Sequence, residues 1–273
     1  MNGPARPEAA KAAGGPAKAG RRTIGVIGGM GPLATADFYL RVVRGTPAAT
    51  DQEHLHVLID SNVEIPDRTA ALEGRGSDPT PLLVETARRL VAAGAEVLVM
   101  PCNSAHAFLD QIREAVPGVP VLDIMEEVAA AAAALRPPPA SAGLLATAGT
   151  VRQRRYHAAL DRRGIEVLVP DAGGQRVVSE VIDAVKAGDT GPAVRGRIRE
   201  AAETLVRAGA GAIVLGCTEV PVILGPGDLA VPVLDGTEIL AQAAIREGFG
   251  EYHSGRERSQ GSIGASLGPV RRH

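Results

Sequence analysis

The chain has 273 residues, of which 45% are hydrophobic, and a formal net charge of −2. This length and composition suffice for one large domain or two small domains with a well-filled core. The near-zero net charge provides no electrostatic attraction to nucleic acid or to a membrane surface, and 2% aromatic residues are too few for a base-stacking platform.

The two ends of the chain have the composition of disordered tails. Residues 1–22 are rich in Ala, Gly and Pro, and residues 251–273 are rich in Gly, Ser and Arg. The first tail lacks the apolar segment of a secretory signal, and no run of about 18 apolar residues occurs that could span a bilayer. Two cysteines are too few for a disulfide framework. We therefore expect a cytoplasmic protein.

Between the tails, short apolar runs alternate with longer segments of helical periodicity. This alternation predicts an α/β fold with parallel sheets covered on both faces. The predicted strands cover residues 23–29, 54–61, 96–101, 119–123, 142–147 and 165–170. The predicted helices cover residues 34–46, 79–95, 104–116, 124–135 and 151–164.

Three consecutive prolines in "RPPPASA" mark the clearest linker, because they cannot continue a helix. We therefore predict a first α/β domain over residues 23–136 and a second over residues 137–236. A C-terminal helix at 237–249 is expected to pack on the first domain.

The second half of the chain repeats the first. "ETARRLVAAGAEVLVMPC" ends at Cys102 and "EAAETLVRAGAGAIVLGC" ends at Cys217, and about half of the aligned positions are identical without a gap. "VPVLD" also occurs in both halves, at 119–123 and 231–235. Shared helix propensity explains the aligned Ala and Leu residues but not the aligned cysteines. We predict two similar halves related by pseudo-twofold symmetry, with a cleft between them.

Each cysteine directly follows a predicted strand and precedes small polar residues. In open parallel sheets ligands bind beyond the carboxyl ends of the strands, so Cys102 and Cys217 are expected to face one pocket. A helix N-terminus after each strand would lower the pKa of the thiol. A lone cysteine in such a place is more often a buried, inert thiol, but a matched pair argues for a function.

A thiolate can act as a metal ligand, a nucleophile or a base. A zinc site needs more ligands than the single nearby histidine, His106, and we expect no metal. A hydrolytic triad of Cys102 with His106 would leave Cys217 without a role. Two thiols on opposite faces of a substrate can instead remove a proton from a carbon and return one from the other side, without a cofactor. Backbone N–H groups and the side chains of Asn103, Ser104 and Thr218 would stabilise the carbanion or enediolate.

The motifs together resemble those of the aspartate/glutamate racemase family of cofactor-independent amino-acid racemases. The matching segments are "GVIGGMGPLAT", "EIPDRT", "MPCNSAH", "LLATAGT" and "LGCTEVP", and the resemblance extends from about residue 23 to 250. "GGMGP" and "PDRT" are typical of the aspartate-racemase-like branch. The resemblance implies two flavodoxin-like domains, a homodimer, and Cys102 and Cys217 as the acid/base pair. In some similar proteins Thr replaces the first cysteine, whereas this chain keeps both cysteines. The corresponding segment of similar proteins is more commonly "CNTAH", and Ser104 makes it "CNSAH" here.

The remaining candidate residues come from the motifs beside the cysteines. Arg68 can hold a carboxylate through two parallel hydrogen bonds, although an arginine in such a loop is by itself more often a surface residue. The resemblance assigns Arg68 to the side-chain carboxylate of the substrate. Lys186, by sequence only a solvated helix-end lysine, is a second carboxylate ligand by the same resemblance. Two further interpretations stay open: Glu219 either contacts the substrate ammonium or is an ordinary first-turn acid, and His106 either tunes the Cys102 thiolate or only packs against it.

The glycine-rich loop and the second half supply the last two candidates. "VIGGMGP" does not fit the spacing of a dinucleotide-binding loop. It forms either a tight turn that presents N–H groups to a carboxylate, with Met30 lining the pocket, or a turn required only by the backbone. Thr147 and Thr150 suit helix capping, and by the resemblance one hydroxyl, chosen as that of Thr147, reaches the substrate.

The sequence therefore predicts a racemase of an acidic amino acid, with aspartate as the first expectation and glutamate as the second. Related reactions of similar proteins remain as alternatives, namely those of maleate isomerases, hydantoin racemases and one-cysteine decarboxylases. A non-catalytic dicarboxylate-binding protein is the alternative from another class.

Overall fold

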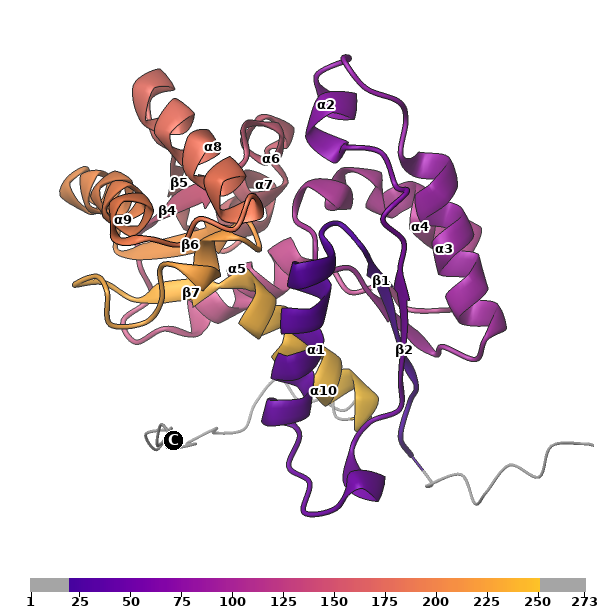
Figure 1. Ribbon diagram of the computed structural model, residues 1–273. Helices are drawn as coiled ribbons and strands as arrows, with labels where there is room; N and C mark the ends of the chain where they lie inside the picture. Colours follow the sequence, from indigo (N-terminus) through magenta and orange to yellow (C-terminus); the bar gives the residue numbers. More distant parts are fainter. Residues whose placement is uncertain (1–19, 251–273) are drawn as a thin grey trace, which may run out of the picture.

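The computed structural model describes residues 20–250, which form two parallel β-sheets with helices packed around them (Figure 1). The first sheet has the order β2-β1-β3, and the second has the order β5-β4-β6-β7. The strands of the first sheet are β1 (Ile24–Gly28), β2 (Val57–Ser61) and β3 (Val97–Val99). Those of the second are β4 (Ser141–Ala146), β5 (Glu166–Leu168), β6 (Ala212–Gly216) and β7 (Val233–Asp235). The predicted α/β class with two similar parallel sheets is confirmed.

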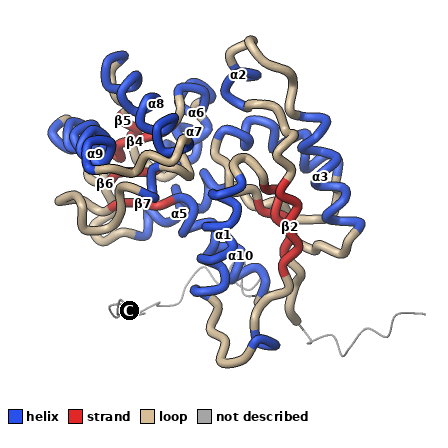
Figure 2. Tube along the Cα trace, in the orientation of Figure 1, coloured by secondary structure: helices blue, strands red, loops and turns tan. Residues whose placement is uncertain are grey.

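The two sheets repeat one topology, as the sequence repeat predicts. β1 and β4 are the central first strands, and each pairs in parallel with the next strand on one side and with the cysteine-bearing strand on the other. Helices surround both sets of strands in Figure 2. A duplicated helix–turn–strand unit accounts for this agreement.

The predicted strand at residues 119–123 is wrong in the first half, where only an isolated bridge between Leu98 and Val121 forms. The same "VPVLD" sequence forms β7 in the second half. The neighbouring strand explains the difference. β3 ends at Val99, so the 119–123 segment pairs only at Leu98, whereas β6 continues to Gly216 and pairs with β7 from Ile213 to Leu215.

Ten α-helices lie within residues 20–250. Those of the first half are α1 (Pro32–Gly45), α2 (Arg68–Leu72), α3 (Thr80–Ala92), α4 (Leu109–Ala115) and α5 (Ile124–Ala134). Those of the second half are α6 (Ala148–Gln153), α7 (Arg155–Asp161), α8 (Ala172–Lys186), α9 (Pro192–Arg207) and α10 (Gly236–Gly248).

Two of the predicted helices differ from the structure. The helix predicted over residues 151–164 is split into α6 and α7, because Arg154 between them adopts a left-handed conformation with φ of 55°. The helix predicted over residues 104–116 begins as a 3₁₀ segment, Ser104–Phe108, before α4.

Alternating side chains of the strands divide the core into three clusters. Ile24 and Val26 of β1 point into a central cluster, while Ile27 points to an outer cluster under α3 and α4. In β4, Leu144 belongs to the same central cluster and Leu145 to a second outer cluster under α8 and α9. The inner faces of both sheets therefore share one hydrophobic core.

Helices α5 and α10 lie between the two sheets in Figure 1 and fill this shared core. α10 contacts α1, α5 and β3 of the first half, and also β6 and β7 of the second. The C-terminal helix expected on the first domain thus packs against both halves. A division at residue 136 separates the two sheets but not their common core.

The predicted tails lie mostly outside the described residues. Residues 20–22 of the first tail are described, and the backbone N–H of Arg22 donates to Gly248 O at 2.8 Å. The guanidinium of Arg21 lies 4.9 Å from the centre of the Phe249 ring. Of the described residues, no helix has the length and apolar character needed to cross a bilayer.

Candidate active site

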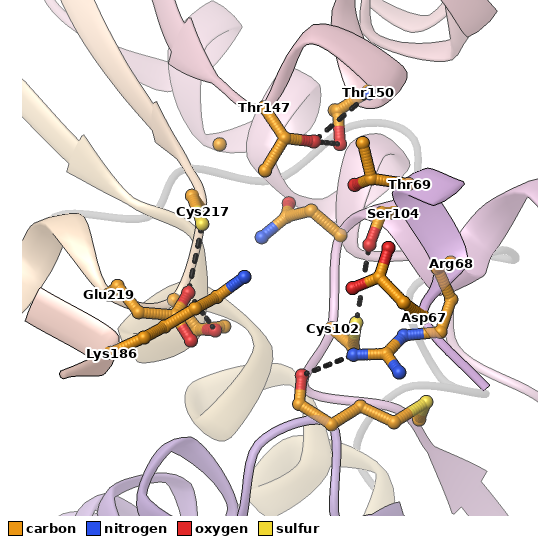
Figure 3. Close-up of a pocket in the computed structure, with 14 residues that line it drawn as sticks. Asp67, Arg68, Thr69, Cys102, Ser104, Thr147, Thr150, Lys186, Cys217 and Glu219 are labelled. Atoms are coloured by element: carbon orange, nitrogen blue, oxygen red, sulfur yellow. Dashed lines mark hydrogen bonds between the residues drawn. The ribbon is translucent and has the colours of Figure 1, made fainter. Parts of the chain in front are cut away.

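Both cysteines line a single pocket between the two halves. Cys102 lies just beyond β3 and Cys217 just beyond β6, and their exposed fractions are 5% and 6%. Figure 3 shows them on different sides of the pocket. The prediction that the two strand ends face one pocket is confirmed by this arrangement.

All the sequence-predicted site residues lie in the lining of this pocket. Besides the cysteines they are Met30, Arg68, Asn103, Ser104, Thr147, Lys186, Thr218 and Glu219. The sequence reasoning missed Asp67, Thr69 and Gly216 as lining residues, and it passed over Thr150 in favour of Thr147. Asp67 and Thr69 flank Arg68 in "PDRT", so attention to the whole motif would have found them.

Arg68 begins α2 and is held by backbone carbonyls. Its Nη1 donates to Ile65 O at 3.2 Å and to Pro66 O at 2.9 Å, and its Nη2 donates to Met30 O at 3.4 Å. Asp67 caps the same helix by accepting from Ala70 N at 2.6 Å. Carbonyl partners orient the guanidinium without neutralising it, so its positive charge is available to an anionic ligand.

Cys102 and its neighbours are fixed by hydrogen bonds within their own loop. The sulfur lies 3.6 Å from Ser104 Oγ. The buried His106 accepts from Ile124 N through Nε2 at 3.2 Å, so its Nδ1 carries the proton and donates to Cys102 O at 2.9 Å. Burial lowers the pKa of His106. His106 therefore contacts the carbonyl of Cys102 and holds the loop against α5, and no hydrogen bond joins its ring to the sulfur.

The Cys217 thiol donates to Glu219 Oε2 at 2.9 Å, and the Thr218 hydroxyl donates to the same oxygen at 3.2 Å. Burial and the negative charge of Glu219 raise the pKa of Cys217 well above its ordinary value, while Lys186 opposes this shift. The lowered pKa expected from a helix N-terminus is wrong for this cysteine. Only a 3₁₀ turn, Val220–Val222, follows it, and a carboxylate lies against the thiol.

Thr147 and Lys186 reach the pocket from the second half. Thr147 is the N-cap of α6, where its hydroxyl accepts from Thr150 N at 3.2 Å and lies 3.0 Å from Thr150 Oγ1. Lys186 is the last residue of α8, and Figure 3 shows its side chain pointing into the pocket. The ammonium and the Arg68 guanidinium thus enter the pocket from different halves.

The glycine-rich loop after β1 requires a glycine at position 29 for its backbone conformation and close packing. Gly29 has φ of 88°, and a Cβ there would lie 2.4 Å from the backbone of Asn62. Its N–H donates to Thr35 Oγ1 at 2.9 Å. These contacts support the backbone explanation for Gly29, while Met30, only 4% exposed, lines the pocket next to it.

Within the described part of the chain, His, Cys, Asp and Glu side chains form no group of three that could bind a metal ion. The chemically active groups of the pocket are two thiols, two cations, two carboxylates and several hydroxyls. This set can transfer protons and bind carboxylates and an ammonium group.

Comparison with known proteins identifies the family of the chain. The sequence profile of the Asp/Glu/hydantoin racemases matches residues 27–244. The chain belongs to the Asp/Glu/hydantoin racemase family. The resemblance inferred from the motifs is therefore confirmed.

Named racemases are similar to the chain over half of its length or more. The broad specificity amino-acid racemase RacX of Bacillus subtilis is 26% identical over 229 residues, which cover 81% of this chain and 96% of that protein. The Picrophilus torridus aspartate racemase structure is 30% identical with a TM-score of 0.74, covering 83% of this chain and 94% of its own. A glutamate racemase of Pseudomonas aeruginosa is 33% identical over 153 residues, which cover 52% of this chain and 54% of that protein.

These racemases are isomerases, which confirms the enzyme class predicted from the sequence. A glutamate racemase structure from Francisella tularensis, in complex with D-glutamate, shares the fold at 18% identity and a TM-score of 0.64.

Proposed function

We propose that the protein is a cofactor-independent racemase that interconverts the L and D forms of an acidic amino acid. The observation that carries this proposal is the position of the only two cysteines of the chain, which approach one pocket from separate halves. Family membership makes amino-acid racemisation the expected chemistry. The pocket charges argue for an acidic substrate.

In the proposed reaction, one cysteine thiolate takes the proton from Cα and becomes a thiol. The electron pair left on Cα delocalises into the α-carboxylate as an enediolate, which the N–H groups beyond each cysteine stabilise. The thiol on the opposite face then gives its proton to Cα and becomes the thiolate. Configuration is inverted, and the two cysteines have exchanged protonation states.

The contact with Glu219 suits Cys217 to begin this reaction as the proton donor. The carboxylate accepts the S–H and its charge disfavours a second negative charge on the sulfur. Cys102, with the Ser104 hydroxyl as its neighbour, is then the base in the same enzyme form. The reverse direction uses the opposite assignment.

Arg68 and Lys186 support a substrate with two carboxylates. One carboxylate can bind at the guanidinium and the other at the ammonium or the N–H groups near the cysteines, while Glu219 or Asp67 binds the substrate ammonium. Aspartate is favoured over glutamate, because the "GGMGP" and "PDRT" motifs are of the aspartate type. The similarity to the aspartate racemase of Picrophilus torridus over 83% of this chain supports the same choice.

The test is hydrogen exchange in heavy water. L-aspartate and L-glutamate are incubated separately with the protein, and loss of the Cα–H signal and of optical activity are followed together. We expect one Cα–H to be lost for each molecule that is inverted, with a faster reaction for aspartate. Tight binding of either acid without exchange would instead favour a non-catalytic binding protein.

Cys102→Ala and Cys217→Ala test the two-base mechanism in the same assay. Each variant removes one of the two proton-transfer groups, so we expect racemisation to fall by about 10²- to 10⁴-fold. Ser104→Ala is the matched control beside Cys102, because it removes a neighbouring hydroxyl but no acid or base, and we expect a smaller loss. Full activity in either cysteine variant would contradict the mechanism.

A further inference from the structure

Tyr156 is a buried side chain of α7 that contacts the chain beside both cysteines. Its hydroxyl donates to Asn103 Oδ1 at 2.6 Å, and Asn103 is the residue after Cys102. Its ring packs against Gly216, the residue before Cys217, where a Cβ would lie 3.2 Å from Tyr156 Cε2. Tyr156 is 0% exposed and lies behind the pocket lining, so it can act on a bound ligand only through its neighbours.

The hydrogen bond from the Tyr156 phenol fixes which end of the Asn103 amide is left for a ligand. Asn103 is 4% exposed and lines the pocket, and its Oδ1 is occupied by the phenol proton. Its Nδ2 is buried and has no hydrogen-bond partner within residues 20–250. Turning the amide over would leave the buried phenol proton without its acceptor, which costs free energy. The hydrogen bond therefore directs the N–H₂ group of Asn103 away from Tyr156.

An oriented, unpaired N–H₂ group in a pocket with two cations suits a carboxylate ligand. An amide donor that is held in place before the reaction loses no free energy to reorientation when charge develops on a carboxylate oxygen. Building on the proposed racemase function, we infer that Tyr156 is a positioning residue. Its hydroxyl holds the Asn103 amide so that Nδ2 donates to a carboxylate of the bound acidic amino acid.

The first test is Tyr156→Phe, which removes the hydroxyl and keeps the ring. We expect kcat/KM for racemisation to fall about 10- to 100-fold, somewhat less than the loss caused by removing an oxyanion donor outright. Thr46→Val is the matched control, because it removes a buried hydroxyl bonded to Val42 O at 2.7 Å outside the pocket lining. We expect the control to change kcat/KM less than about twofold.

A double-mutant cycle separates positioning from general stabilisation. In an Asn103→Ala background, Tyr156→Phe should change kcat/KM less than about twofold, because the amide that it positions is absent. An equal loss in both backgrounds would overturn the inference. So would an unchanged kcat/KM per folded molecule in the single variant.

A second measurement uses the wild-type protein and does not depend on a variant that folds. The chain has only three asparagines, Asn2, Asn62 and Asn103, so isotope-labelled asparagine gives few side-chain amide signals in an NMR spectrum. Saturation with racemic aspartate should shift the Asn103 signal. The Asn62 signal should stay in place, because its Nδ2 already donates to Thr86 Oγ1 at 3.1 Å. An unshifted Asn103 signal on saturation would overturn the inference.

Failure of the inference is distinguishable from failure of the proposed function. If wild-type protein exchanges no Cα–H of aspartate or glutamate, the racemase proposal fails, and the inference with it. If wild-type protein exchanges it and Tyr156→Phe does so equally well, only the positioning role fails.

Discussion

Glu219 and Cys217 are two residues apart, and the 3₁₀ turn after β6 brings the carboxylate against the thiol at 2.9 Å. A carboxylate in this position has two effects. It orients the S–H bond, and it raises the pKa of a thiol that burial has already raised. Glu219 therefore favours the protonated form of Cys217 before a substrate binds.

Glu219→Gln tests this bias directly. It removes the negative charge beside the thiol while keeping a hydrogen-bond acceptor, so the pKa of Cys217 should fall and its thiolate should form at lower pH. The measurement is the ultraviolet absorbance of the thiolate against pH in a Cys102→Ala background, in which Cys217 is the sole cysteine. A pKa equal to or above that of Cys102→Ala alone would contradict the assigned role of Glu219.

The end of β6 can pack in its place only because residue 216 is a glycine. A Cβ on Gly216 would lie 2.7 Å from Leu144 Cδ1 and 3.0 Å from Ala146 Cβ, as well as close to Tyr156. Real Cβ atoms do not approach packed neighbours so closely, so the strand could not keep its position beside β4. The glycine therefore keeps Cys217 at its place in the pocket.

We expect Gly216→Ala to lower the free energy of unfolding by about 1–3 kcal/mol through overpacking. Its kcat/KM should fall as well, because the strand end carries Cys217. Gly196→Ala is the matched control: this glycine lies within α9 with open space around its Cα, and alanine there should raise stability by about 0.5–1 kcal/mol. Urea denaturation and the racemisation assay measure both variants. Equal stability of the two variants would contradict this account of β6.

At the scale of the whole molecule, the central cluster joins the two halves. It contains β1 residues such as Ile24 and β4 residues such as Leu144, together with apolar side chains of α5 and α10. Separating the halves would expose the inner faces of both sheets to water, at a cost proportional to the apolar area exposed. Neither half can bury its inner face alone.

We therefore expect residues 20–250 to unfold in one cooperative transition despite their two sheets. Calorimetric and van't Hoff enthalpies should agree. Ile24→Ala in the first half and Leu144→Ala in the second should each lower the free energy of unfolding by about 2–5 kcal/mol and shift that single transition. Two separate transitions, each sensitive to only one of the variants, would show that the halves unfold independently.

The sequence by itself determined the architecture and most of the residues that line the pocket. Strand and helix periodicity, the repeat that aligns Cys102 with Cys217, and the resemblance of the motifs beside them were enough to predict two parallel sheets and a shared site. This was possible because a strand end is a local feature, and parallel strands bring their carboxyl ends to one edge of a sheet. Arg68 and Lys186 were assigned to the site by the family resemblance, since local pattern alone makes them a surface arginine and a solvated helix-end lysine.

Only the tertiary structure decided which side chains meet. The hydrogen bond from Tyr156 to Asn103 spans 53 residues, and no local pattern in either segment indicates it. The direction of the Cys217 pKa shift depends on burial and on the rotamer of Glu219, and the position of α10 depends on a core shared by both sheets. Such contacts follow from how the two halves pack, because burial and distance are properties of the assembled fold rather than of any segment.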